Sequence, residues 1–293
     1  VSTVWMSVSG IFNSHLIMAA AVERAGSEEQ KAKWLPKFAS GELRGGIALT
    51  EPDAGTDLQG IRTRADKSGN GYSLNGAKTW ISNAVEGGIL AILAKTDPEA
   101  EPRHKGMSLF LVEKSSEFQV TKRMKKLGYK GIDSGEFVMD DLFVPGENLI
   151  GGVEGRGLQQ ILSGLELGRI NVAARAVGVA TAAFNSAIKY AQKRETFGKP
   201  IADHQAIQFM LADCVNELAS TRLMLYEICK AHDSNQDVKI LHGKCSMIKL
   251  LASEMANRVA DRAVQIFGGR GYMRENVAER YYRELRVDRI WEG

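Results

Sequence analysis

Apolar and polar positions divide the chain into three blocks with different periods. Residues 1–43 and 156–293 show the spacing of amphipathic helices, whereas residues 44–155 contain short runs rich in β-branched and aromatic residues. We therefore predict an α+β protein with the remainder of an N-terminal helical domain (1–43), a central β-domain (44–155) and a C-terminal helical bundle domain (156–293).

The first block carries clear helix signals. Ser27 and Gln30 have the spacing of a capping box, in which the Ser hydroxyl accepts a backbone N–H and the Gln side chain accepts another. Pro36 predicts the start of a second short helix, because proline is favoured in a first turn. Gly41 predicts the end of that helix.

The central block reads as several short strands between turns. The β-rich runs are bounded by Gly, Asn, Asp or Pro and cover residues 71–76, 78–82, 89–95 and 107–112. Such a series predicts a small β-barrel or sandwich.

The last block predicts a four-helix bundle. Residues 157–194 read as one long helix, whose small side chains at 173–180 allow close helix packing and whose Arg169 and Arg175 argue against a membrane span. Further helices are expected at 203–231, 238–267 and 276–288. Gly268 and Gly269 close the third helix, and short connections favour antiparallel neighbours.

Composition narrows the function classes. The formal net charge is +3, from 38 basic and 35 acidic residues, which argues against a dedicated nucleic-acid binder. Three cysteines without a C-x-x-C spacing indicate reduced thiols. The histidines form no H-E-x-x-H pattern, so we expect neither a zinc hydrolase nor a bound metal. Because the chain starts at Val1 and stops at Gly293 after a helical pattern, we expect both ends to be cut.

Five motifs carry a family resemblance. They are residues 48–57 (ALTEPDAGTD), 76–83 (GAKTWISN), 193–198 (KRETFG), 264–269 (VQIFGG) and 289–293 (RIWEG). In this order and at these separations, they resemble the acyl-CoA dehydrogenase family over nearly the whole chain. Without the resemblance, the pattern supports only an α+β protein with a helical bundle.

The resemblance implies an FAD-dependent acyl-CoA dehydrogenase. A base removes the α-proton of the acyl-CoA thioester while hydride passes from the β-carbon to flavin N5, which gives the trans-2-enoyl-CoA. It also implies a homotetramer, a dimer of dimers that shares each FAD site across subunits, and electron transfer to an electron-transferring flavoprotein in fatty acid β-oxidation. Bacterial cytoplasm and mitochondrial matrix both suit reduced cysteines.

The same resemblance assigns cofactor residues. Within one subunit they are Ile47, Leu49, Thr50, Thr56, Trp80, Ile81 and Ser82; from the neighbouring subunit they are Arg194, Thr196, Phe197, Gln205, Gln265, Gly268 and Gly269. Trp80 and Ser82 share a face, because side chains alternate along a strand. From the pattern alone, a Trp80 side chain in the β-core is the more common interpretation. The glycines do not form G-x-G-x-x-G after a strand, which excludes a Rossmann site.

Glu292 is the candidate base. From composition alone it is a surface carboxylate at a helix end, but the resemblance places it beside the substrate α-carbon. Desolvation is expected to raise its pKa so that proton transfer is better matched. Donors must also polarise the thioester oxygen, and the resemblance implies the ribityl hydroxyl of FAD and the backbone N–H of Glu292. Trp291 stands where Tyr is common.

A minority of the family places the base immediately before the arginine that matches Arg169. Here that neighbour is Gly168, which cannot act as a base. Glu166 faces about 200° away from position 168 on a helix, and we interpret it as the partner of Arg169 in a surface ion pair. The resemblance assigns substrate contacts to Thr56, Glu166, Leu167, Gly168, Arg169 and Gly293.

Two other functions stay open from the sequence. One is an acyl-CoA oxidase or another flavoenzyme on the same scaffold, and the other is a non-catalytic subunit that serves assembly. The presence of Glu292 weighs against the second. The length and branching of the acyl chain are not readable from the residues.

Overall fold

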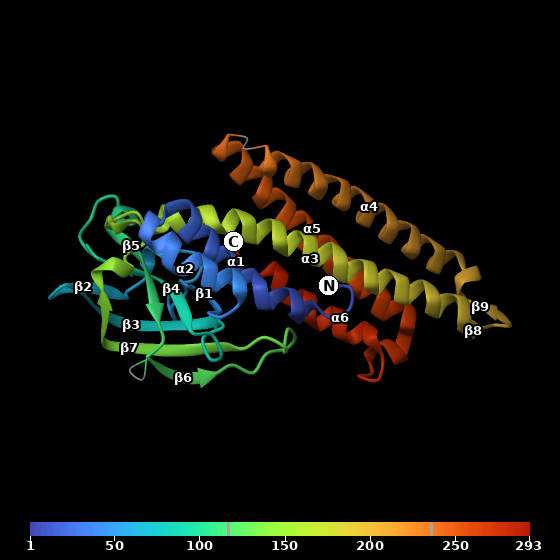
Figure 1. Ribbon diagram of the computed structural model, residues 1–293. Coiled ribbons are helices and arrows are strands. Elements are labelled where there is room, and N and C mark those ends of the chain that lie inside the picture. Colours follow the sequence, from blue (N-terminus) through green and yellow to red (C-terminus); the bar gives the residue numbers. More distant parts are fainter. Residues whose placement is uncertain (116–117, 235–236) are drawn as a thin grey trace. The chain divides into compact units, whose positions relative to one another are not determined.

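The computed structural model describes residues 1–115, 118–234 and 237–293 (Figure 1). It forms two compact units. The β unit comprises residues 11–125 and 131–168, and the helical unit comprises residues 1–10, 126–130 and 169–293. The helices α1 (Met6–Ala25) and α3 (Gly157–Lys193) contribute residues to both units. The domain limits inferred from the sequence stay a prediction.

The N-terminal helices behave as their end signals predict, with one exception. Ser27 caps α2 (Glu28–Ser40) and forms the capping box with Gln30, and Gly41 ends the helix in the left-handed conformation, at φ 76°. Pro36 lies inside α2 and does not start a new helix, so the prediction of a helix start at Pro36 is wrong. The buried rings of Trp34 and Phe38 flank it, stacked 6.4 Å apart, and hold the helix across the proline.

The central block forms one mixed sheet. Seven strands of the described chain pair in it: β1 (Gly45–Ala48), β2 (Arg64–Ser68), β3 (Gly71–Ser82), β4 (Ile89–Lys95), β5 (Met107–Glu113), β6 (Gln119–Arg123) and β7 (Ser134–Pro145). Their order is β1-β4-β2-β3-β7-β6, with β5 on β4. The runs 71–76 and 78–82, predicted as separate strands, are one strand, β3, whose register against β7 shifts twice.

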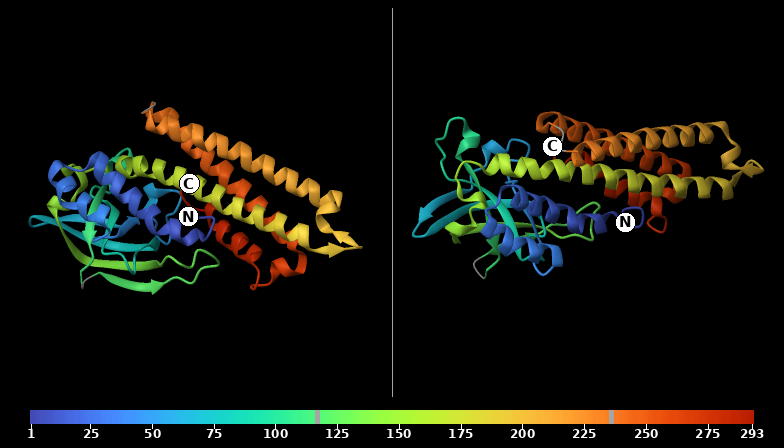
Figure 2. Two further views of the ribbon diagram at one scale, coloured as in Figure 1. Left: turned by 45° about the vertical axis from the view of Figure 1, so that its right-hand side comes forward. Right: turned by 45° about the horizontal axis from the view of Figure 1, so that its top comes forward.

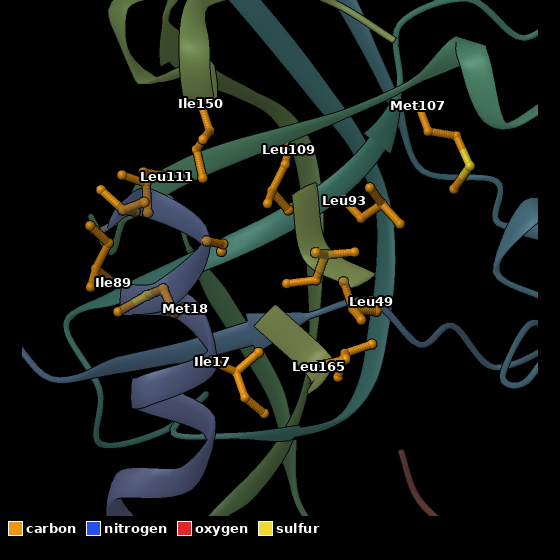
Figure 3. Close-up of a cluster of buried hydrophobic side chains, with 14 of the residues drawn as sticks. Ile17, Met18, Leu49, Ile89, Leu93, Met107, Leu109, Leu111, Ile150 and Leu165 are labelled. Carbon is orange, nitrogen blue, oxygen red and sulfur yellow. The ribbon is translucent and has the colours of Figure 1, made fainter. Parts of the chain in front are cut away.

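Two apolar layers hold the β unit together. Along β4, Ile89 and Leu93 belong to a cluster that includes α1 and α2, whereas Leu90 and Ile92 belong to a second cluster with β3 and β7. Figure 3 shows the first cluster, with the β4 and β5 side chains beside Ile17 and Met18 of α1. Because both faces of β4 are buried, this strand is a continuous apolar run.

The helical unit contains the predicted bundle. Residues 169–193 of α3 pack with α4 (Gln205–Asp233), α5 (Val238–Phe267) and α6 (Val277–Leu285), and Figures 1 and 2 show the long helices side by side. A hairpin of β8 (Glu195–Thr196) and β9 (Lys199–Pro200) joins α3 to α4. A 3-10 turn, η7 (Arg286–Arg289), follows α6 and leads to Glu292.

Small side chains of α3 and α5 are buried in the helical unit, where the sequence predicts close helix packing. On α3, Ala173, Ala176 and Ala180 are fully buried, and on α5 Ala256 and Ala260 are fully buried. Small residues let helix backbones approach closely, which brings polar residues of α3 and α5 within reach of each other. Among the described helices, none has the length and apolar content needed to cross a membrane.

Candidate active site

Glu292 has a backbone conformation that its neighbours must hold. Its φ is +58°, in the left-handed region that few residues other than glycine adopt. Arg169 Nε donates to the Glu292 carbonyl oxygen at 3.1 Å, and Lys249 Nζ donates to the Gly293 carbonyl oxygen at 3.2 Å. Side chains of α3 and α5 therefore hold the carbonyl groups of Glu292 and of the residue that follows it. The Oε2 atom of Glu292 is buried.

The Arg169 side chain reaches several groups at once. Besides the Glu292 carbonyl, its Nη1 lies 3.0 Å from Ser246 Oγ and 3.3 Å from His242 Nε2. Both partners lie on α5, one turn apart. Arg169 is thus a cross-link between α3, α5 and the segment that carries the candidate base.

A buried ion pair lies in the segment just before Glu292. Arg175 Nη2 donates to Asp288 Oδ1 at 2.6 Å, and the two residues are 3% and 0% exposed. The indole Nε1 of Trp291 donates to the same oxygen at 3.1 Å. Tyr129 lies over this group, with its hydroxyl 3.3 Å from Arg175 Nη1.

Charge and burial shape the titration of these groups. Burial lowers the pKa of Lys249, although the carboxylates of Glu292 and Asp288 oppose that shift. Burial raises the pKa of Asp288, and the Arg175 guanidinium opposes it. Burial also raises the pKa of Tyr129 to about 12. Cationic and anionic side chains thus lie close together around Glu292, and each opposes the effect of burial on the other.

Glu166 does not form the surface ion pair that was predicted. It is 4% exposed, and its Oε2 lies 3.6 Å from Nη1 of Arg24, which is on α1. The prediction fails because it placed the α3 face that carries Glu166 at the surface, whereas that face packs in the β unit. Gly168 is buried and Leu167 is half-buried.

In the β unit, Trp80 is exposed rather than part of the core. Its side chain is 63% exposed and its φ is +57°, at the second register shift of β3. Ser82 is half-buried, whereas Ile81 between them is 4% exposed and belongs to the core. The predicted alternation therefore holds, and Trp80 presents a large aromatic face outward. Any cofactor contact at Ile81 would use its backbone.

The loop that follows β1 is held by hydrogen bonds from buried residues of β3. Lys78 Nζ lies 2.8 Å from Glu51 Oε1 and donates to the Leu49 carbonyl at 3.0 Å. Thr79 N donates to the Thr50 carbonyl at 3.0 Å. Ile47 and Thr50 are half-buried and Leu49 is buried, while Thr56 is exposed. Asp53 is exposed, 3.5 Å from Arg62 Nη1.

In the helical unit, the predicted cofactor residues lie near the C-terminal ends of α3 and α5, which are neighbours. The rings of Tyr190 on α3 and Phe267 on α5 stack 4.2 Å apart. This stacking places Gly268 and Gly269 near the end of α3, where Arg194 follows. The exposed members at these ends are Arg194, Phe197, Gln205, Gln265, Gly268 and Gly269, and Thr196 is half-buried.

These residues fit a flat aromatic cofactor with polar substituents. Phe197 is 97% exposed at φ +53°, which repeats the features of Trp80. A Cβ on Gly268 or Gly269 would meet no atom within 4 Å, so the backbone there is open to a partner. An exposed aromatic side chain on constrained backbone, with uncrowded glycine backbone nearby, suits stacking and close approach of FAD.

Sequence reasoning missed several residues of the site. Asp288, Lys249, His242, Ser246 and Tyr129 were not singled out, because each is far from Glu292 in the chain or unremarkable in pattern. Only Asp288 carried a signal: it is an acidic residue on the turn that leads to Glu292. The others become visible only when α3 and α5 are packed.

Comparison with known proteins defines the family. The acyl-CoA dehydrogenase N-terminal, middle and C-terminal domain models match residues 1–42, 46–142 and 155–293. The chain belongs to the acyl-CoA dehydrogenase family. The predicted family and the helical–β–helical fold are confirmed.

Individual relatives agree with this assignment. The mitochondrial 2-methylacyl-CoA dehydrogenase of Solanum tuberosum is 40% identical over 271 residues, which are 92% of this chain and 64% of the relative. The caffeyl-CoA reductase-Etf complex subunit CarC of Acetobacterium woodii is 40% identical over 92% of this chain and 70% of its own length. The chain thus spans about two thirds of the length of these relatives.

Solved structures show the same fold and its cofactor. Butyryl-CoA dehydrogenase from Megasphaera elsdenii matches with a TM-score of 0.94 and 34% identity, over 100% of this chain and 76% of that one. The structure described as PigA with FAD and proline matches with a TM-score of 0.92 and 32% identity, over 98% and 74%. FAD is confirmed as the cofactor of the family.

Proposed function

We propose that this chain carries the active site of an FAD-dependent acyl-CoA dehydrogenase with Glu292 as the base. The observation that carries the proposal is the placement of Glu292. It occupies the position that the family resemblance assigns to the base, and Arg169 and Lys249 fix its backbone in the left-handed conformation. A carboxylate held in one place beside an α-carbon can remove a weakly acidic proton.

The residues around Glu292 have separable roles in the proposal. Arg169 and Lys249 bond the carbonyls of Glu292 and Gly293. The Glu292 N–H is proposed to donate to the thioester oxygen, where enolate charge develops. The partial burial of the Glu292 carboxyl is expected to raise its pKa once the acyl chain excludes water. Thr56, Glu166, Leu167, Gly168, Arg169 and Gly293 stay the proposed substrate contacts.

Bound FAD supplies an acceptor for the hydride that leaves the β-carbon. The proposed contacts in the β unit are Ile47, Leu49, Thr50, Thr56, Trp80, Ile81 and Ser82. Arg194, Thr196, Phe197, Gln205, Gln265, Gly268 and Gly269 are proposed to reach the cofactor of a neighbouring subunit. The exposure of Phe197 and the openness at Gly268 support contact with a partner outside this chain.

A homotetramer is the proposed assembly. Large apolar side chains are exposed along α4 and α5, among them Phe209, Leu223, Tyr226, Met247 and Leu250, each more than half exposed. An apolar helix surface of this kind is typical of a protein–protein interface. If subunits share the FAD site, FAD binding and assembly are thermodynamically linked.

An electron-transferring flavoprotein is the proposed redox partner. The relative from Acetobacterium woodii is named as a subunit of a reductase-Etf complex. That name also favours a second candidate: the same site could reduce an enoyl-CoA, because the chemistry is reversible. An acyl-CoA oxidase would instead form peroxide rapidly in air. Relatives named mitochondrial and bacterial support either the matrix or the bacterial cytoplasm.

An anaerobic half-reaction tests the proposal. The protein, purified with FAD, is mixed without oxygen with acyl-CoAs of several lengths and branching patterns while the yellow flavin absorbance is recorded. Bleaching by one class of acyl-CoA supports the dehydrogenase and identifies its substrate. Glu292→Gln is expected to retain FAD and to lose bleaching. If Glu292→Gln bleached at a near-normal rate, the assignment of the base would be wrong.

A further inference from the structure

The residue immediately before Glu292 has its side chain fixed inside the helical unit. The indole Nε1 of Trp291 donates to Asp288 Oδ1 at 3.1 Å. Its ring meets the Tyr129 ring edge-on, with centroids 5.0 Å apart, and the Arg175 guanidinium carbon lies 4.9 Å from its ring centroid. Trp291 is therefore held on several sides, and its neighbour Glu292 inherits that restriction through one peptide bond.

The ion pair that holds Trp291 is a poor device for stability alone. Arg175 and Asp288 are almost wholly buried, so both ions lose their hydration. Within the described chain, Arg175 Nε and Asp288 Oδ2 also find no hydrogen-bond partner. Replacement of such a pair by apolar residues is often neutral or stabilising. A buried, incompletely satisfied pair beside the candidate base therefore calls for a role other than stability.

The backbone conformation of Glu292 must be held by neighbouring groups, and the Arg175–Asp288 pair is close enough to contribute. A non-glycine residue at φ +58° persists only where its surroundings determine its conformation. Arg169 fixes the carbonyl of Glu292, on its C-terminal side. Asp288 fixes the side chain of Trp291, on its N-terminal side. The two contacts come from opposite sides of the same residue.

We propose that the Arg175–Asp288 pair is a positioning pair for the base: it holds the Trp291 indole and thereby orients the Glu292 carboxylate toward the substrate α-proton. The inference rests on the proposed function of Glu292. Asp288 is buried and acts through Trp291, so it is a positioning residue rather than a group that touches the substrate. The Arg175 guanidinium favours the ionised form of Asp288 by donating to Oδ1 at 2.6 Å, and an ionised carboxylate is the stronger acceptor for the indole N–H.

Three variants test the pair. Asp288→Asn removes the charge but leaves Arg175 unpaired, and this variant is the one most at risk of misfolding. The double variant Arg175→Met with Asp288→Leu removes both charges and is expected to fold. Trp291→Phe keeps the ion pair and removes the indole donor. The matched control is Glu254→Gln on α5, which breaks the more exposed ion pair between Glu254 and Arg289, the residue after Asp288.

The measurements separate positioning from structure. For each variant we would record FAD content, unfolding midpoint and affinity for an enoyl-CoA. The rate at which the acyl-CoA α-protons exchange in deuterated water measures proton removal by the base. The rate of anaerobic bleaching per bound flavin measures the whole half-reaction. Backbone amide hydrogen exchange at residues 290–293 in the unliganded protein measures how rigid this segment is, independently of turnover.

The double variant and Trp291→Phe are expected to bind FAD and enoyl-CoA normally. Their α-proton exchange and bleaching should slow on the order of 10- to 100-fold per flavin, as for a base displaced by about 1 Å. Amide exchange at residues 290–293 should accelerate, and Glu254→Gln should match the parent. Normal rates per flavin in the double variant and in Trp291→Phe would overturn the inference. An active Glu292→Gln variant would instead overturn the proposed function.

Discussion

Lys78 Nζ lies 2.8 Å from Glu51 Oε1, and both side chains are buried in the β unit. Glu51 also accepts from the backbone N–H groups of Arg62 and Thr63, at 2.6 and 3.0 Å. Lys78 donates in addition to the Leu49 carbonyl. The pair therefore ties the proposed flavin-contacting loop to the strand that carries Trp80.

The two partners of this pair are not equivalent, and we predict different costs for their removal. Glu51→Ala leaves a buried ammonium with one carbonyl acceptor and should cost about 3–5 kcal/mol of unfolding free energy. Lys78→Met leaves a carboxylate that still accepts N–H bonds, and it should cost less. Denaturant unfolding of the two variants measures the difference. Asp53→Asn, in the exposed pair with Arg62, is the control, and an equal loss in all three would contradict the prediction.

Lys78 also predicts a pH dependence of stability. Burial lowers its pKa to about 8, although Glu51 opposes the shift. Between this value and the unfolded pKa of about 10.4, the unfolded state binds more protons than the folded state. The contribution of Lys78 to the free energy of unfolding should therefore rise with pH in this window.

The measurement is the difference in unfolding free energy between the parent and Lys78→Met. Groups that do not contact Lys78 titrate equally in both proteins, so their contributions cancel in the difference. Lys78 lowers the pKa of its partner Glu51, but a carboxyl group ordinarily titrates at about pH 4, far below this window. The difference should grow in favour of the parent from pH 8 to pH 10, by about 2 kcal/mol. A difference that stayed flat or fell with pH would show that Lys78 has no depressed pKa.

Arg169 allows a prediction about geometry rather than charge. Its guanidinium bonds the Glu292 carbonyl and Ser246 and approaches His242. Arg169→Lys retains the charge but loses the planar fork that reaches several acceptors. Bleaching per flavin should fall on the order of 10- to 100-fold, while FAD content stays unchanged. Ser246→Ala removes one contact and should have a smaller effect; an equal effect would show that the fork is not what matters.

The sequence predicted where helices begin and end better than it predicted which side chains contact each other. Helix α5 was predicted with its observed limits, Val238–Phe267, because its apolar spacing and Gly268 are local signals. Glu166 was misplaced at the surface, because burial of that face depends on Arg24 and α1, far away in the chain. Asp288 and Arg175 were missed as a pair for the same reason: 113 residues separate them.

The exposed aromatic at position 80 predicts a separation between stability and cofactor affinity. Trp80 is 63% exposed at φ +57°, so in the absence of a ligand it contributes strain and little burial. Trp80→Gly relieves the left-handed strain, of roughly 1–2 kcal/mol, and offsets it by roughly 0.5–1 kcal/mol of extra backbone entropy in the unfolded chain. The unfolding free energy of the FAD-free protein should therefore change little, or increase.

FAD affinity should respond in the opposite direction, because the proposed stacking surface is lost. We expect FAD to dissociate on the order of 10-fold more readily, since an aromatic contact contributes about 0.5–1.5 kcal/mol beyond the area it buries. Fluorescence titration of the FAD-free protein measures the affinity for FAD. The affinity of Trp80→Phe, which keeps an aromatic ring, should lie between those of the parent and Trp80→Gly. If Trp80→Gly weakened the FAD-free fold and left FAD affinity unchanged, the ring would serve the β unit and not the cofactor.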